Sequence, residues 1–163
     1  MYEVPGTDIG LTQGDIFSDC PIVDWIRSTP DAWEPQKYTQ NVIVLTQACD
    51  LANQKAGRVQ VAIVHDAKQL IATNVVKAAA VKDQIRTHRV FGLYFLPEFE
   101  NYLSESIVDL RDVHTVPREL LEQFIRTGKR FIRLQTPYRE HLAQHFAVTF
   151  SRIALPEPYE TKP

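Results

Sequence analysis

The sequence predicts an α+β fold, in which short antiparallel strands are decorated by about three helices, one of them at the carboxy terminus. An apolar, β-branched run at 42–45 ends abruptly in polar residues, as a strand does where it leaves a buried core. A second such run, 59–64, follows after a turn and is its expected hairpin partner. Residues 117–128 begin with proline and end with glycine, the punctuation of a short amphipathic helix.

Composition narrows the class of protein. With 163 residues and 44% apolar content, the chain can form one core, and we expect a single domain over 1–163. No apolar stretch approaches the roughly 20 residues of a membrane helix, and the amino terminus lacks the pattern of a secretory signal. We therefore expect a cytoplasmic protein without a membrane partner, in which Cys20 and Cys49 are free thiols.

The amino-terminal third predicts an arm, two strands and a loop. Residues 1–11 are interrupted by glycine and proline and are expected to form a flexible arm. Residues 14–17 predict a first strand, and the alternating residues 21–26 predict a second. Residues 28–40 contain two prolines among small polar residues, which predicts a long loop. A loop of this length in a compact domain is usually functional or mobile.

The middle of the chain predicts one long helix between strands. Asp66 is expected to cap a helix that runs to about Arg86, because the apolar residues keep a helical spacing and the interval contains neither glycine nor proline. Residues 89–96 and 106–110 then predict two strands, the first of which is stopped by Pro97.

The carboxy-terminal part predicts a helix, a strand and a second helix. Pro117 and Gly128 bracket the first helix, and residues 131–135 predict the last strand. Pro137 begins a terminal helix whose apolar residues share one face as far as Ile153. Residues 156–163 are expected to be a disordered tail.

Positive charge gathers in the carboxy-terminal third. The stretch 126–139 contains no acidic residue, and its cations are Arg126, Lys129, Arg130, Arg133 and Arg139. Clustered guanidinium groups suit phosphate, and the aromatic residues between them suit the bases of single-stranded nucleic acid. Trp33 and Lys37 of the long loop are candidates for the opposite side of such a groove. In the alternative interpretation, the aromatic residues belong to the core and the cations form an ordinary solvated face.

Cys49 and Asp50 stand where the apolar strand ends. Cys49 would be a nucleophile if a cation or a helix amino terminus stabilised its thiolate. The neighbouring carboxylate of Asp50 opposes this, because it raises the pKa of the thiol. Asp50 itself fits a turn or helix cap, and it is also a candidate acid or base.

His141 and His145 lie four residues apart on the terminal helix and therefore share a face. This spacing is used by pairs of zinc ligands. The metalloprotease motif requires glutamate directly after the first histidine, and Leu142 stands there. We expect neither a metal nor another cofactor, and His141 remains a candidate acid or base for catalysis.

The order of the predicted elements resembles that of the MazF/PemK toxin family, whose members are small closed β-barrels. The likeness rests on the strand that begins Gly14-Asp15-Ile16, the apolar strand with its hairpin partner, and the segment 106–116, which starts with a predicted strand and leads into a short helix. It covers about residues 12–65 and 104–127. The resemblance implies a small antiparallel SH3-like barrel carrying the predicted helices.

The catalytic residues of the family are not matched. Members that cleave single-stranded RNA carry an arginine just before the apolar strand and a threonine at the end of its hairpin partner. Here Gln40 and Asn41 precede the apolar strand, and His65 and Asp66 follow its partner. Any RNA cleavage would therefore depend on relocated groups.

Two functions from different classes follow. The first is a bacterial toxin or phage-defence module that binds single-stranded RNA or another anionic partner. As an endoribonuclease it would use Asp50 or His141 for proton transfer and the carboxy-terminal cations as phosphate clamps. The second is a non-enzymatic module that binds a basic cognate protein through the Trp33 loop and the acidic amino-terminal region. A third, an enzyme dependent on Cys49, is less favoured because of Asp50.

Overall fold

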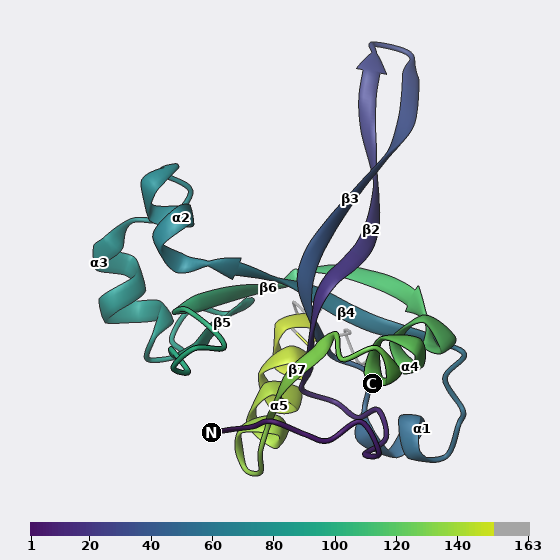
Figure 1. Cartoon of the computed structure of the whole chain (residues 1–163). Coiled ribbons are helices and arrows are strands. Elements are labelled where there is room, and N and C mark those ends of the chain that lie inside the picture. Colours follow the sequence, from purple (N-terminus) through teal and green to yellow (C-terminus); the bar gives the residue numbers. More distant parts are fainter. Residues whose placement is uncertain (152–163) are drawn as a thin grey trace, which may run out of the picture.

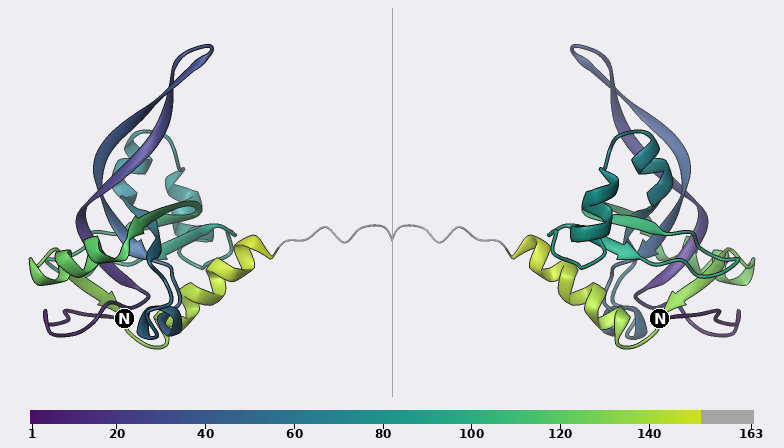
Figure 2. Two further views of the ribbon diagram at one scale, coloured as in Figure 1. Left: turned by 90° about the vertical axis from the view of Figure 1, so that its right-hand side faces the viewer. Right: turned by 90° about the vertical axis from the view of Figure 1, so that its left-hand side faces the viewer.

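The structure, a computed structural model, describes residues 1–151, which form one sheet with helices around it (Figures 1 and 2). All strand pairs are antiparallel, and the strand order is β1-β7-β2-β3-β4-β6-β5. The predicted α+β class is therefore confirmed. The end strands β1 and β5 are not paired with each other in the described residues, so the sheet is open and the predicted SH3-like barrel is not confirmed.

The elements of the described residues have the following bounds. The strands are β1 (Tyr2–Glu3), β2 (Asp15–Thr29), β3 (Ala32–Val44), β4 (Arg58–Asp66), β5 (Leu93–Leu96), β6 (Ser106–Pro117) and β7 (Arg130–Leu134). The helices are α1 (Ala48–Ala52), α2 (Ala67–Ala72), α3 (Ala78–Ala80), α4 (Arg118–Arg126) and α5 (Tyr138–Phe150), and a π-helical turn (Val81–Ile85) follows α3. None of these helices has the length and apolar character needed to cross a membrane.

The strands β2 and β3 form a long hairpin whose outer half stands clear of the rest of the molecule (Figures 1 and 2). The two strands predicted at 14–17 and 21–26 are one strand, β2, with a bulge between Phe17 and Cys20. The predicted loop at 28–40 is wrong, because only residues 30–31 turn the chain. Pro35 is tolerated in β3 because it lies in the outer ribbon, which has only two strands and therefore unpaired edges.

The strand β4 lies between β3 and β6. It pairs with the apolar end of β3, as predicted for residues 59–64. The strand β6 reaches Pro117 and is longer than the predicted 106–110, whereas β5 is shorter than the predicted 89–96. The extra length of β6 carries its polar residues 112–115 alongside the start of β4.

The long helix predicted over 66–86 is wrong, although its start is correct. The Asp66 side chain accepts a hydrogen bond from the backbone N–H of Gln69, 2.9 Å away, and caps α2. The chain then breaks at Asn74, which adopts a left-handed conformation with φ of 56°. The break lets α2 and the following helical segment fold back together, so that Ala67, Val81 and Ile85 share one core cluster. A straight helix over this interval would extend roughly 30 Å, which would separate Ala67 from Ile85.

The two carboxy-terminal helices lie close to their predicted positions. Pro117 precedes α4, and Gly128 follows it with φ of 73°, as expected for the end of a helix. The helix α5 begins after Pro137. Its predicted end at Ile153 and the predicted tail 156–163 lie outside the described residues. The five-residue helix α1 was not predicted.

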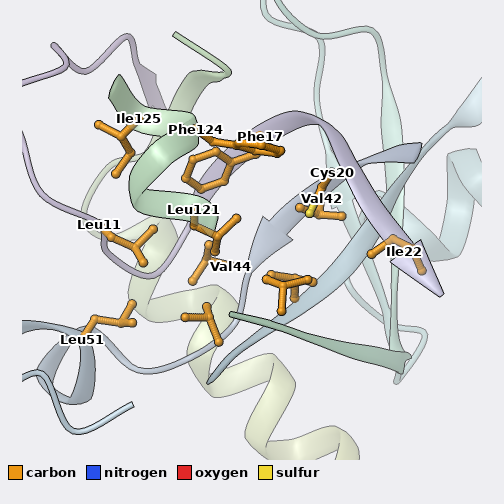
Figure 3. Close-up of a cluster of buried hydrophobic side chains, with 13 residues drawn as sticks. Leu11, Phe17, Cys20, Ile22, Val42, Val44, Leu51, Leu121, Phe124 and Ile125 are labelled. Carbon is orange, nitrogen blue, oxygen red and sulfur yellow. The ribbon is translucent and has the colours of Figure 1, made fainter. Parts of the chain in front are cut away.

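The core has clusters on the two faces of the sheet. One is shown in Figure 3 and joins residues of β2, β3 and β4 to the buried face of α4, including Phe17, Val44 and Leu121. The other lies between the sheet and α5 and includes Leu142. The segment 1–11, which was predicted to be a flexible arm, contains β1 and contributes Leu11 to the first cluster.

Candidate functional site

The two central cations of the predicted phosphate site are buried. The side chains of Arg130 and Arg133 are 1% and 9% exposed, and both bind the carboxylate of Asp15. Arg130 also donates to the backbone carbonyl oxygens of Gly6 and Gly10, at 2.6 and 3.1 Å, and Arg133 donates to Gly10 at 2.7 Å. Burial lowers the pKa of Arg130, and the charge of Asp15 opposes this effect. These arginines hold β7, β2 and the amino-terminal segment together, and they are not available to a ligand.

The remaining predicted cations do not form a trough. Lys129 lies 3.9 Å from Asp19, and Arg139 pairs with Glu140 at 2.9 Å. Arg126 is exposed and makes no ion pair within residues 1–151. The prediction that the cations of 126–139 converge on one open surface is therefore wrong, because the buried pair faces Asp15 and Lys129 and Arg139 each have a separate local partner.

Cys49 and Asp50 lie in the first turn of α1. The Cys49 thiol is exposed and lies 3.6 Å from Gln47 Oε1 and 4.0 Å from Asp50 Oδ1. No cation contacts its sulfur in the described residues. The expectation that Asp50 caps the following turn is not met, because within residues 1–151 its carboxylate accepts a contact only from the thiol. Asp50 lines a small pocket below α5.

His141 and His145 meet a third histidine, His88, beside Tyr94. The ring centroid of His88 lies 4.7 Å from that of His141 and 5.8 Å from that of His145. The Tyr94 hydroxyl lies 3.1 Å from Nδ1 of His141. Burial, followed by the two neighbouring histidines, lowers the pKa of His88 to about 4, and burial also lowers the pKa of His145. Among the described residues no three side chains are arranged to hold a metal, so we assign these histidines to packing between α5 and the sheet.

A cavity of useful size lies elsewhere, at the base of the β2–β3 hairpin. We call it the hairpin groove. It has a volume of about 540 Å³ and lies between the hairpin, the end of β6 and the start of α4. Its apolar wall includes Ile22 and Leu120, and its polar lining is Lys37, Arg58, His114 and Thr115. The exposed indole of Trp25 also lines it.

Strand pairing brings these side chains to the groove. Lys37 lies opposite Val23 across the hairpin, and His114 lies opposite Val61 between β4 and β6. Arg58 begins β4 and is fixed by Thr115, whose carbonyl oxygen and hydroxyl accept from its guanidinium at 3.0 and 3.1 Å. One wall of the groove therefore belongs to the hairpin and the other to the sheet.

His114 lies between two carboxylates. Its Nδ1 is 3.7 Å from Oδ1 of Asp24, and its Nε2 is 3.3 Å from Oδ1 of Asp112, without hydrogen-bond geometry at Nε2. The Tyr38 hydroxyl donates to Asp24. Burial, assisted by this hydrogen bond and by the charge of Asp24, raises the pKa of Tyr38 to about 12. Tyr38 therefore keeps its proton at neutral pH and orients Asp24, which in turn flanks the imidazole.

The hairpin groove contains one residue that was a candidate from the sequence and several that were not. Lys37 was expected on one side of a groove whose other side held the cations of 126–139; it lines the hairpin groove, and none of those cations lines it. Trp33 was its expected companion, but it lies farther out on the hairpin, where the Arg27 guanidinium stacks 5.0 Å from its ring centroid. His114 and Arg58 were missed because neither belongs to a cluster in the sequence. The polar, apolar, polar order of Asp112, Val113 and His114 was the signal that could have extended β6 to His114.

Comparison with known proteins adds no relative. No protein-family model matches this sequence, and no curated protein matches it.

Proposed function

We propose that this protein binds single-stranded nucleic acid, with RNA as the preferred ligand, in the hairpin groove. The observation that carries the proposal is the convergence of Lys37, Arg58 and His114 around a cavity edged by the exposed ring of Trp25. Cations that follow the phosphate backbone beside an accessible aromatic ring are the usual means of holding a single strand. The polar lining comes from three different strands, so the groove is formed by the way these strands pair in the folded protein.

The groove also holds the groups needed to cleave RNA. In this reaction His114, flanked by Asp24 and Asp112, accepts the proton of a 2′-hydroxyl, whose oxygen then bonds to phosphorus. The bond from phosphorus to the 5′-oxygen breaks, and the leaving oxygen takes a proton from solvent or from a second acid. Lys37 and Arg58 stabilise the charge that develops on the phosphorane. We propose these residues in place of Asp50 and His141.

Membership of a MazF/PemK-like toxin or defence group is part of the same proposal. Its support is the order of the antiparallel hairpins β2–β3 and β3–β4 and the short helix that follows β6. The groove does contain an arginine bonded to a threonine, Arg58 and Thr115, but at other strand positions than the family uses. Closure of the sheet into a barrel remains a proposal.

The experiment is fluorescence anisotropy with a labelled short RNA at two salt concentrations. The double variant K37Q/R58Q should bind at least about tenfold more weakly and show a smaller dependence on salt, because two phosphate contacts are lost. The matched control is R126Q/K55Q, which removes the same charge outside the groove. Equal losses in both variants, or wild-type binding that does not respond to salt, would contradict the proposal. Incubation of unlabelled RNA with wild-type protein then tests cleavage by the appearance of fragments.

The exposed hairpin favours a second candidate function, the binding of a basic protein. Trp25 and Trp33 are 65% and 55% exposed, and Val23 and Ile26 are also accessible. Exposed apolar residues gathered on one projecting element are typical of interaction surfaces. Acidic residues outnumber basic ones along the ribbon, so a basic partner fits best. The substitution W33S distinguishes the two functions, since it should disrupt a protein complex observed by size-exclusion chromatography and leave RNA binding unchanged.

A further inference from the structure

We infer that a second pocket, which we call the amide pocket, receives one nucleobase of the bound strand and prefers guanine. The inference rests on the proposed nucleic-acid function and specifies what would give it sequence preference. The pocket has a volume of about 340 Å³ and lies where the polar end of β3 and the start of β4 meet the inner side of α5. This volume is at the small end of ligand pockets and suits a single planar ring system.

The lining of the pocket excludes phosphate as its ligand. Three carboxamides line it, from Gln13, Gln47 and Gln60, together with the carboxylate of Asp50 and the hydroxyl of Thr46. Neither lysine nor arginine is among the lining residues. A carboxylate without a cation repels an anion, whereas amides and a carboxylate match the donors and acceptors on the edge of a neutral base.

Part of this lining is held rigidly by the backbone. Gln13 is only 5% exposed, and its Nε2 donates to the carbonyl oxygen of Leu45 at 2.8 Å. The Thr46 hydroxyl accepts from the backbone N–H of Gln60 at 2.7 Å. These bonds fix two polar groups at the end of β3 before any ligand arrives, which reduces the entropy lost on binding.

Other polar atoms of the lining remain unused. Within residues 1–151 the carboxamide oxygen of Gln13 and the whole carboxamide of Gln60 make no hydrogen bond to another residue. The Asp50 carboxylate accepts only the long contact from the Cys49 thiol. The pocket thus has acceptors and donors free for a ligand.

An aromatic pair from α5 forms the opposite wall. Phe146 and Phe150 pack edge to face with ring centroids 5.3 Å apart, and Phe150 is 59% exposed. A large apolar ring exposed at this position is not explained by the core, which α5 reaches through Leu142 and its neighbours. A base that entered between the amides and this pair would stack on a phenyl ring.

The carboxylate decides which base fits. Guanine presents two adjacent N–H donors, on N1 and on the 2-amino group, and one carboxylate can accept both. Adenine and cytosine present one amino group to it, and uracil places carbonyl oxygens on both sides of its single N–H. We therefore expect guanine to bind most tightly and uracil most weakly.

The amide pocket and the hairpin groove share the start of β4. Gln60 lines the pocket and Arg58 lines the groove, two residues apart on this strand. The residue opposite Gln60 in the ladder is Thr115, which bonds Arg58.

The test uses nucleosides, which carry no phosphate and so do not require the groove cations. Guanosine, inosine, adenosine, cytidine and uridine are titrated into ¹⁵N-labelled full-length protein and followed by NMR. Guanosine should shift the side-chain amide signals of Gln13 and Gln60, and inosine, which lacks the 2-amino group, should bind several-fold more weakly. The substitutions D50N and Q60L should weaken guanosine binding about tenfold, the equivalent of one well-placed hydrogen-bonded pair. K37Q/R58Q should leave it unchanged.

The outcomes separate this inference from the proposed function. Guanosine binding in a protein that binds no RNA would overturn the function and support the pocket. RNA binding without any nucleoside shift, or with equal shifts from uridine and guanosine, would overturn the pocket and leave the function standing. Loss of guanosine binding in K37Q/R58Q would also overturn it, because the ligand would then lie in the groove.

Discussion

This molecule contains two groups of basic residues, one buried and paired with a carboxylate and the other at the edge of an open groove. Asp15, Arg130 and Arg133 form a buried cluster in which each charge has a partner inside the protein. Lys37 and Arg58 border an open groove, and no carboxylate of the described residues pairs with either of them. The buried cluster stabilises the fold, whereas the groove leaves its positive charge available to a ligand. The position of the acidic partner, more than the number of arginines, distinguishes a structural cluster from a binding site.

Removal of Asp15 should produce the largest effect on stability. D15A leaves two buried guanidinium groups without their anion, and breaking such a pair costs about 3–5 kcal/mol. Urea unfolding followed by far-UV circular dichroism measures the change. The control is D24A in the groove, where the exposed carboxylate should account for about 1 kcal/mol or less. Similar losses in both variants would contradict the difference between the two regions.

Substitution of His114 should affect chemistry more than stability. If the groove cleaves RNA, H114A should slow cleavage by about 10²-fold or more, because the proton acceptor is lost. Gel electrophoresis of a defined RNA measures the rate. H65Q is the control, since His65 lies on β4 outside the groove and should retain the wild-type rate. An unchanged rate in H114A would remove His114 from the mechanism.

The two hairpin tryptophans should differ in their contribution to RNA binding. W25A removes the ring that edges the groove, and the loss of one stacked base is worth roughly 1–3 kcal/mol of binding free energy. W33A removes a ring of the same size farther out on the ribbon. Anisotropy titrations of both variants measure the effect. Equal weakening would show that the ligand follows the whole hairpin and not the groove.

The histidine cluster provides a third environment, partly buried between α5 and the sheet, and the smallest expected effect. The pKa of His88 in the folded protein, about 4, lies below its ordinary value of 6.5, so the unfolded chain binds more protons between these pH values. Stability should therefore be complete above about pH 6.5 and fall as the pH is lowered toward 4. Within residues 1–151 the rings packed against His88 are those of His141, His145 and Tyr94, and no carboxylate is among the causes of its pKa shift. H88F should flatten this dependence in urea unfolding measured from pH 7 to pH 4, and an unaltered slope would assign it to other groups.

Local signals predicted the elements whose boundaries depend on a few neighbouring residues. Pro117 and Gly128 predicted the bounds of α4, and the apolar run 59–64 predicted β4. Asp66 predicted the start of α2. The failures arose where distant contacts outweigh local ones. Proline and small polar residues at 28–40 are typical of loops, but pairing with β2 extends them into β3. The helical spacing after Asp66 is genuine, but packing against β5 and β6 favours a break at Asn74.

The site was harder to predict than the fold for the same reason. Arg130 and Arg133 stood out as a cluster, yet their partner Asp15 lies more than a hundred residues earlier in the chain. The groove residues Arg58 and His114 come from separate strands and are adjacent only after β4 and β6 pair. Lys37 was expected in a groove opposite the cations of 126–139, and from a segment that was taken for a loop; it lines a different groove.

The bulge between Phe17 and Cys20 has a mechanical consequence. One side of the groove is formed by the sheet. The other side is formed by the two-stranded ribbon, which leaves the sheet just beyond this bulge. A bulge bends its strand and increases the local twist. The bulge therefore sets the angle between the ribbon and the sheet, and this angle determines the width of the groove between them.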